Sequence, residues 1–161
     1  MSIHRIFCIW LCWLASIAFA YADTPRPLAI VIAAASDIGV IKKIAPEELS
    51  LIYWRKKQYW QGGVRIYPVN LHAEDALRLQ FSKTILGSFP NEQSNYWNGQ
   101  YFHGISPPYS VQSEEAVIRY VAATKGAIGY VDACNVDERV KVLLWVNNEH
   151  ILINKPAIDC P

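Results

Sequence analysis

The apolar run at residues 28–35 (LAIVIAAA) constrains the fold more than any other feature of this sequence. A strand with one face in water alternates apolar and polar side chains, whereas this run contains no polar position. The pattern indicates a strand that is covered on both faces, as in a largely parallel sheet with helices on each side.

Helical patterns follow this strand. Pro46 suits the first position of a helix, and the apolar residues Leu49, Ile52 and Tyr53 then share one face. A second helix is predicted over residues 73–86. A third begins after Ser113, a favoured N-cap residue, and ends at Gly126.

Strand patterns alternate with these helices, which predicts one compact α/β domain without internal repeats. The last two strands are expected to form a hairpin around Asn147 and Asn148, residues that tolerate turn conformations. The predicted strands after the first lie at residues 64–69, 127–131, 140–146 and 150–153.

The first 22 residues have the layout of a secretory signal peptide. A basic start precedes an apolar core at residues 6–20, and Ala20 and Ala22 place small residues at the expected cleavage site. The core is too short to span a bilayer. We therefore expect a cleavable signal (residues 1–22) and a single domain (residues 23–161) located in the periplasm.

Two cysteines remain after removal of this signal, Cys134 and Cys160. Two thiols in an oxidising compartment usually pair, so we predict a disulfide that holds the C-terminal tail. The alternative is a pair of buried free thiols. Two sulfur atoms do not complete a metal site by themselves, and neither a metal nor a cofactor is expected.

The charge of the predicted mature chain is balanced: 14 basic residues remain of the 15 once Arg5 is removed, against 14 acidic ones. A nucleic-acid partner is therefore not expected. The basic triplet Arg55, Lys56 and Lys57 follows the first helix. We interpret it as complementing the helix dipole at a solvated surface, in preference to an anion site.

Several segments occur in an order typical of one protein family. The chain resembles the phosphate ABC-transporter substrate-binding proteins, in particular their short, single-lobe relatives. The resemblance implies a single lobe of the type-2 periplasmic-binding fold, a PBP-like domain with a mixed, mostly parallel sheet flanked by helices. The matching segments are LSLIYWRKKQYW (49–60), GGVRIYPV (62–69), Phe81, Tyr96, Trp97, Phe102, Gly104, Pro107, Pro108 and GAIGYVD (126–132).

The family places an Arg and a Ser-Gly-Thr turn after the strand that corresponds to residues 66–69, and these groups hold phosphate. Here the corresponding stretch contains no Arg, Gly or hydroxyl residue. Glu74 and Asp75 are expected in the first helical turn, where carboxylates repel an anion. Asn70 and His72 are the remaining candidate ligand-binding residues. The alternative is that Asn70 closes a turn and His72 is merely exposed.

Aromatic residues, glycine and proline gather between residues 96 and 109. Tyr101, His103 and Tyr109 are candidates for an interaction surface, with a place in the core as the alternative. Trp97 and Phe102 are predicted to cover the core.

No catalytic motif accompanies the histidines at positions 72, 103 and 150, so an enzyme is not expected. Two functional classes remain. One is an exported substrate-binding protein for phosphate or another small oxyanion, working with an ABC transporter. The other is a single-lobe interaction module of the periplasm that has lost phosphate binding. Its partner would be a periplasmic or membrane-complex protein, or an identical chain.

Overall fold

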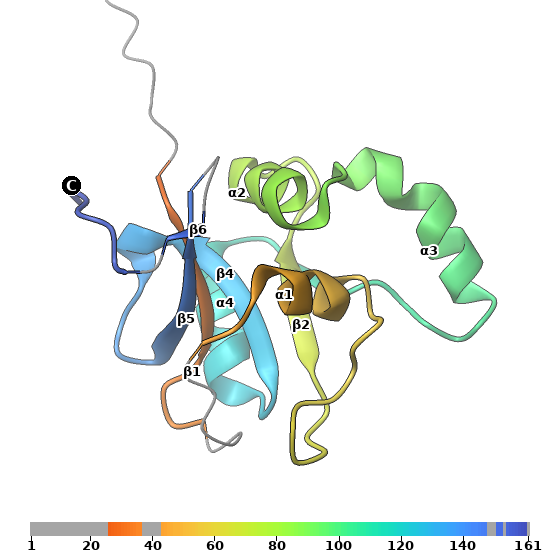
Figure 1. Cartoon of the computed structure of the whole chain (residues 1–161), viewed down its shortest axis with the longest axis horizontal. Coiled ribbons are helices and arrows are strands. Elements are labelled where there is room, and N and C mark those ends of the chain that lie inside the picture. Colours follow the sequence, from red (N-terminus) through yellow and green to blue (C-terminus); the bar gives the residue numbers. More distant parts are fainter. Residues whose placement is uncertain (1–25, 37–42, 148–150, 153, 161) are drawn as a thin grey trace, which may run out of the picture.

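A computed structural model describes residues 26–36, 43–147, 151–152 and 154–160. A six-stranded sheet in the order β3-β2-β4-β1-β5-β6 forms its centre (Figure 1). The strands are β1 (Leu28–Ala33), β2 (Tyr67–Leu71), β3 (Tyr109–Val111), β4 (Ala127–Asp132), β5 (Val140–Val146) and β6 (Ile151–Leu152).

The sheet is mixed, and strands β2, β3, β4 and β5 point in the same direction. Strand β1 lies between β4 and β5 and is antiparallel to both. Its residues from Leu28 to Ile32 are at most 1% exposed, which confirms the predicted cover on both faces. The apolar run therefore predicts a central position in the sheet. It does not predict the direction of the strand, which is antiparallel to both neighbours.

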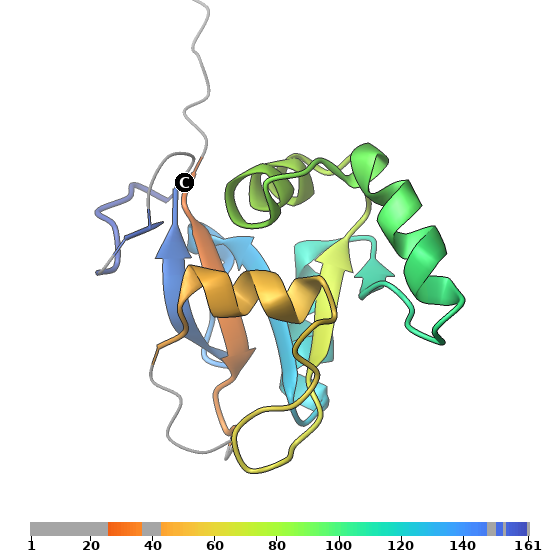
Figure 2. The ribbon, with the colours of Figure 1, turned by 45° about the vertical axis from the view of Figure 1, so that its right-hand side comes forward.

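Helices cover both faces of the sheet (Figures 1 and 2). Helix α1 (Pro46–Tyr53) lies on one face, and helix α4 (Glu114–Ala123) packs on the other against β4. Helix α2 (Ala76–Phe81) continues into a π-helical segment (Ser82–Leu86), and α3 (Ser94–Tyr101) lies at the edge of the molecule. The described residues also include two short 3₁₀ segments, Pro90–Gln93 and Ala133–Asn135.

The predicted helix boundaries are confirmed where a local signal fixed them. Pro46 is the first residue of α1, and the Ser113 Oγ accepts a hydrogen bond from the Ala116 N–H at 3.2 Å. Gly126 has a φ of +89°, a conformation that suits glycine after a helix end. The predicted helix over residues 73–86 instead begins at Ala76.

An aromatic cluster joins α1, α2 and β4 inside the core. The ring of Phe81 stacks on Tyr130 at 4.2 Å and lies 4.5 Å from Tyr53. The Tyr53 hydroxyl donates to the Val69 carbonyl at 3.1 Å, so its polar end is satisfied inside the sheet.

The C-terminal part contains the predicted hairpin and the predicted disulfide. Strands β5 and β6 pair antiparallel, and Cys134 is bonded to Cys160. The predicted signal peptide lies outside the described residues, as do residues 148–150, where the turn of the hairpin is predicted. In the part of the chain that the structure describes, no helix has both the length and the hydropathy required to cross a bilayer.

Candidate functional site

The turn after β2 is the place where the family resemblance puts the ligand. Asn70 lies in strand β2 and not in a turn, and it is 2% exposed. Its Oδ1 accepts from the Tyr130 hydroxyl at 3.3 Å, and the same hydroxyl accepts from the Leu71 N–H at 3.2 Å. These bonds engage the Asn70 oxygen within the sheet. Its ligand role stays a prediction.

The carboxylate of Asp75 occupies the start of α2. It accepts from the N–H groups of Leu77 at 2.8 Å and Arg78 at 3.3 Å, as an N-cap does. Glu74 lies before the helix, with a side chain that is 87% exposed, so its predicted place in the first turn is wrong. Asp75 therefore fills the position in which backbone N–H groups could hold an anion.

His72 is partly exposed beside these two carboxylates. Its Nδ1 lies 3.5 Å from the Glu74 carboxylate, and its Nε2 lies 3.7 Å from that of Asp75. Among the described residues, no group of three or more His, Cys, Asp or Glu side chains could hold a metal ion. The ligand role of His72 also stays a prediction.

Further acidic groups lie at this end of the sheet, where β2 and β4 finish. Asp132 ends β4 and pairs with Arg26 at 3.2 Å, and Glu114 accepts from the Asp132 N–H. Together with Glu74 and Asp75, they place four carboxylates at this end, against the guanidinium groups of Arg26 and of Arg78 in α2. The balance of charge there disfavours an anionic ligand.

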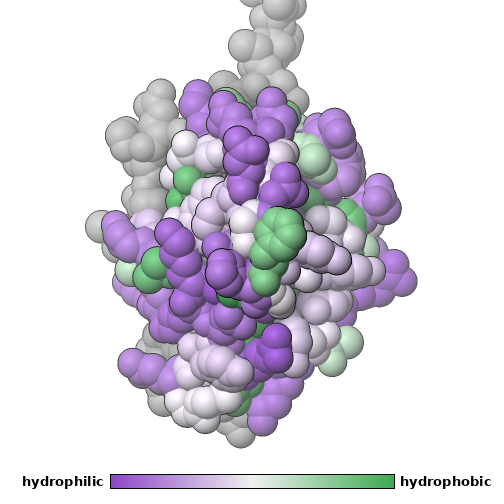
Figure 3. Space-filling view, turned by 90° about the vertical axis from the view of Figure 1, so that its right-hand side faces the viewer, coloured by the Kyte–Doolittle hydropathy of each residue, from purple (hydrophilic) through white to green (hydrophobic). Residues whose placement is uncertain are grey.

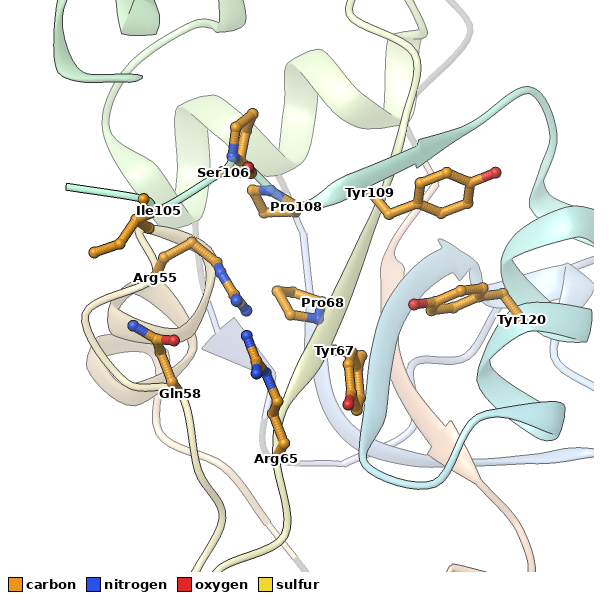
Figure 4. Close-up of a pocket in the computed structure, with 12 residues that line it drawn as sticks. Arg55, Gln58, Arg65, Tyr67, Pro68, Ile105, Ser106, Pro108, Tyr109 and Tyr120 are labelled. Carbon is orange, nitrogen blue, oxygen red and sulfur yellow. The ribbon is translucent and has the colours of Figure 1, made fainter. Parts of the chain in front are cut away.

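A pocket of about 190 Å³ lies at the opposite end of β2 and β3, where both strands begin (Figure 4). Arg55 and Arg65 extend into it with their guanidinium groups toward one another. Its other walls come from Tyr67, Tyr109, Tyr120 and the segment 104–108, and no acidic residue lines it. Two cations therefore share a pocket that holds no carboxylate.

The end of α1 positions Arg55. This residue takes a left-handed conformation with a φ of 59°, which costs an L-residue about 1–2 kcal/mol. Its Nη1 donates to the Ile66 carbonyl at 3.3 Å, while its Nε is buried without a hydrogen-bond partner. Burial, and then the charge of Arg65, lower the pKa of Arg55. An anion between the two guanidinium groups would oppose both effects.

A loop from Gln58 to Ile66 positions Arg65. Residues Tyr59 and Arg65 form an antiparallel bridge, and the Ile66 N–H donates to the Gln58 carbonyl at 2.8 Å. The guanidinium of Arg65 lies 5.9 Å from the ring centroid of Tyr67, a cation–π distance. The bridge therefore fixes the backbone of Arg65, and its exposed guanidinium lies beside the Tyr67 ring.

Tyrosines form the side of the pocket away from the arginines. The rings of Tyr109 and Tyr120 lie 5.5 Å apart, and Figure 4 shows the Tyr120 hydroxyl directed toward Tyr67. Burial, and then the neighbouring Tyr67 and Tyr109, raise the pKa of Tyr120. Its hydroxyl is therefore protonated at neutral pH and can donate a hydrogen bond.

Residues of the basic triplet separate in space. Lys57 pairs with Glu48, and Lys56 lies over the ring of Tyr96. Only Arg55 enters the pocket, so the dipole interpretation of the triplet does not account for it. The Arg55–Arg65 pair is not predictable from the sequence, because Arg65 belongs to another segment and no local spacing links the two residues.

The predicted interaction residues are exposed. Tyr101 is 73% exposed, Tyr109 is 61% exposed, and His103 also faces solvent. Phe102 is 86% exposed, so its predicted place over the core is wrong. Figure 3, seen from the side on which α3 lies, shows hydrophobic side chains scattered among hydrophilic ones. A large apolar docking patch is not visible on this face.

Trp97 is half-buried and helps to attach α3 to the end of α1. It stacks on Trp54 at 5.9 Å, and the Tyr96 hydroxyl donates to the Trp54 carbonyl at 2.6 Å. The segment after α3 then returns along the pocket to β3. Helix α3 therefore helps to place one wall of the pocket.

Comparisons with known proteins find similarity in structure. No protein-family model matches the sequence, and no curated protein matches it. An ABC-type phosphate transport receptor from Vibrio cholerae matches with a TM-score of 0.58 and 22% identity, over 73% of this chain and 45% of the receptor. A Clostridium perfringens structure, described as a phosphate ABC transporter substrate-binding protein with bound phosphate, matches with a TM-score of 0.58 and 17% identity, over the same shares of the two chains.

A third match, PstS from Borrelia burgdorferi, has a TM-score of 0.54 and 15% identity, over 73% of this chain and 47% of PstS. The chain has the fold of about half of a phosphate transport receptor. This confirms the predicted fold class and the predicted resemblance in fold. The chain spans less than half the length of these proteins. These proteins are described as transport receptors and binding proteins, not as enzymes.

Proposed function

We propose that the chain is an exported, non-catalytic substrate-binding-like protein of the periplasm that captures a small oxyanion such as phosphate. The convergence of Arg55 and Arg65 in one pocket carries this proposal. A guanidinium group is planar and always charged, and it presents paired N–H donors that match the oxygen spacing of phosphate and carboxylate.

The pocket offers further donors around these charges. The Gln58 side chain lies beside Arg55, and the hydroxyl of Tyr120 is directed inward from the other side (Figure 4). An oxyanion here would relieve the repulsion between two cations, whereas at the turn after β2 it would meet Glu74 and Asp75. The charges therefore favour the Arg55–Arg65 pocket over the position that the family resemblance suggests.

Calorimetric titration with inorganic phosphate, with sulfate alongside, tests the proposal. The protein is expressed from the full chain and purified, and its mass shows whether residues 1–22 have been removed. We expect saturable binding that Arg65→Gln weakens at least about tenfold, the loss of one charge-assisted contact. Lys83→Gln, a loss of one exposed positive charge outside the pocket, should change nothing. Absence of binding by the wild-type protein would refute the proposal.

A second candidate function is a single-lobe interaction module with an identical chain or another periplasmic protein as partner. The exposed aromatic residues Tyr101 and Phe102 at the end of α3 favour it. Sedimentation over a range of protein concentrations tests self-association. The double variant Tyr101→Ser, Phe102→Ser should abolish any association without loss of thermal stability. A monomer at every concentration would exclude the identical chain as partner.

A further inference from the structure

We infer that the ligand of the Arg55–Arg65 pocket is an organic anion, with a phosphate, sulfate or carboxylate group carried on a flat ring. This inference rests on the proposed function, because it requires that the two arginines bind an oxyanion. It goes further in naming what the rest of the pocket binds.

The pocket has charge on one side and rings on the other (Figure 4). Arg55 and Arg65 lie on one side, while Tyr109 and Tyr120 lie on the other, with Tyr67 between them. An inorganic oxyanion carries charge on all sides and would use only the cationic part. A ligand with one charged end and one flat apolar end would contact both parts.

The size of the pocket supports the same conclusion. A cavity of about 150 Å³ is large enough to hold a benzene molecule. The Arg55–Arg65 pocket measures about 190 Å³, which is enough for a six-membered ring, and it opens to solvent, so the charged group need not lie wholly inside it. A single phosphate ion would leave much of this space to water.

The walls around this space are flat and rigid. Pro68 and Pro108 face the pocket, and neither side chain can rotate away. The ring of Tyr120 packs beside that of Tyr109, with 5.5 Å between the ring centroids. Binding of a planar ligand would therefore cost little conformational entropy of these side chains. The ring of the ligand would add contact area with the pocket walls.

The hydroxyl group of Tyr120 is free to contact a ligand. The Tyr120 hydroxyl makes no hydrogen bond within the described chain, although its residue is only partly exposed. It is directed into the pocket (Figure 4). It is therefore available to donate to an oxygen of the ligand, at the boundary between the charged and the aromatic parts.

Titration with phenyl phosphate and with inorganic phosphate tests the inference. We expect phenyl phosphate to bind about tenfold more tightly, as burial of part of one ring predicts. Phenyl sulfate and benzoate, compared in the same way, identify the preferred anionic group. Phenol, which has the ring without the strong anion, should not bind measurably.

Variants assign the preference to the ring side of the pocket. Tyr120→Leu should reduce the preference for phenyl phosphate over inorganic phosphate to about twofold or less, because the lost hydroxyl weakens both ligands alike whereas the lost ring weakens phenyl phosphate alone. Tyr109→Leu, at a more exposed position, should act in the same direction and serves if the first variant does not fold. Tyr101→Leu is the matched control outside the pocket.

The two proposals fail in distinguishable ways. Equal affinities for inorganic phosphate and phenyl phosphate would overturn the inference and leave the proposed function standing. No binding of any of these anions would overturn both. Binding of phenyl phosphate alone would support the inference and refute the proposed capture of a free inorganic oxyanion.

Discussion

Gly129 of β4 lies directly beneath Val117 of α4. A Cβ atom added at Gly129 would lie 2.5 Å from Val117 Cγ1 and 3.0 Å from methyl groups of Val121 and Val69. Real Cβ atoms do not approach other heavy atoms this closely. The absence of a side chain at position 129 is therefore what allows α4 to approach the sheet.

We predict that Gly129→Ala lowers the free energy of unfolding by about 1–3 kcal/mol, because helix and strand must move apart. Gly99→Ala is the matched control, since an added Cβ at this position in α3 meets no atom within 4 Å. It should stabilise the protein by about 0.5–1 kcal/mol through the better helix propensity of alanine. Urea denaturation of both variants measures the difference, and equal stabilities would contradict the packing argument.

The cap of α2 can be tested at Asp75. We expect Asp75→Ala to cost about 1 kcal/mol of unfolding free energy, because the Leu77 N–H loses its acceptor. Asp75→Ser should keep most of that stability, since a hydroxyl also caps a helix. Glu74→Ala, at the exposed neighbouring position, should have no measurable effect. Chemical denaturation decides, and equal losses at both positions would disprove the cap.

Low pH should remove the contribution that an ion-pair network around Arg139 makes to the stability of the fold. Its guanidinium donates to Glu115 and Asp137, and these bonds hold the pKa of each carboxyl below the ordinary values of 4.5 and 3.8. A lowered folded-state pKa means that the stabilisation is present above the ordinary pKa. It is lost as the pH falls through the folded-state pKa.

Arg139→Gln should therefore be less stable than the wild type at neutral pH and equally stable in strong acid. Urea denaturation midpoints of the wild type and Arg139→Gln, measured from neutral pH to strong acid, test the expectation. The exposed Lys83→Gln is the control. A gap that stays constant down to the lowest pH would show that Arg139 acts through packing alone.

The disulfide should hold the C-terminal segment to the end of β4. On the chain-entropy model, a loop of 26 residues between Cys134 and Cys160 contributes roughly 3–4 kcal/mol. We expect the double variant Cys134→Ser, Cys160→Ser to melt at a lower temperature than the oxidised protein. Reduction of the wild type should produce the same shift. An unchanged melting temperature in both cases would show that the cross-link does not constrain unfolding.

Arg78 in α2 is a buried cation, 7% exposed, whose Nε and Nη1 atoms have no hydrogen-bond partner. Burial lowers its pKa. We predict that Arg78→Met raises the free energy of unfolding by on the order of 1 kcal/mol, because an unpaired buried charge is removed. The exposed Arg119→Met is the control. A loss of stability in Arg78→Met would show that the guanidinium is paired with water or an ion.

Sequence alone determined the features that depend on neighbours along the chain. The apolar run from Leu28 marks a strand buried on both faces, Pro46 marks the start of α1, and Ser113 marks the cap of α4. The periodicity of buried residues, helix capping and turn preferences depend on residues close together in the chain, so they can be predicted from the sequence. The two cysteines outside the predicted signal peptide were also enough to predict the pairing of Cys134 with Cys160.

Helix α3 was missed because none of its residues is fully buried, so its sequence carries no apolar period. Phe102 was misplaced for a related reason. An aromatic side chain predicts burial on average, but α3 attaches through Tyr96 and Trp97 and leaves the ring of Phe102 in solvent.

Only the tertiary structure decided the direction of β1 and the composition of the pocket. Antiparallel pairing of β1 depends on where the chain returns after the strand, which its own side chains do not encode. Arg55 and Arg65 meet because one residue leaves α1 in a left-handed conformation and the following loop brings the other back. Convergence of this kind depends on loop closure and packing between segments, and no spacing in the sequence specifies it.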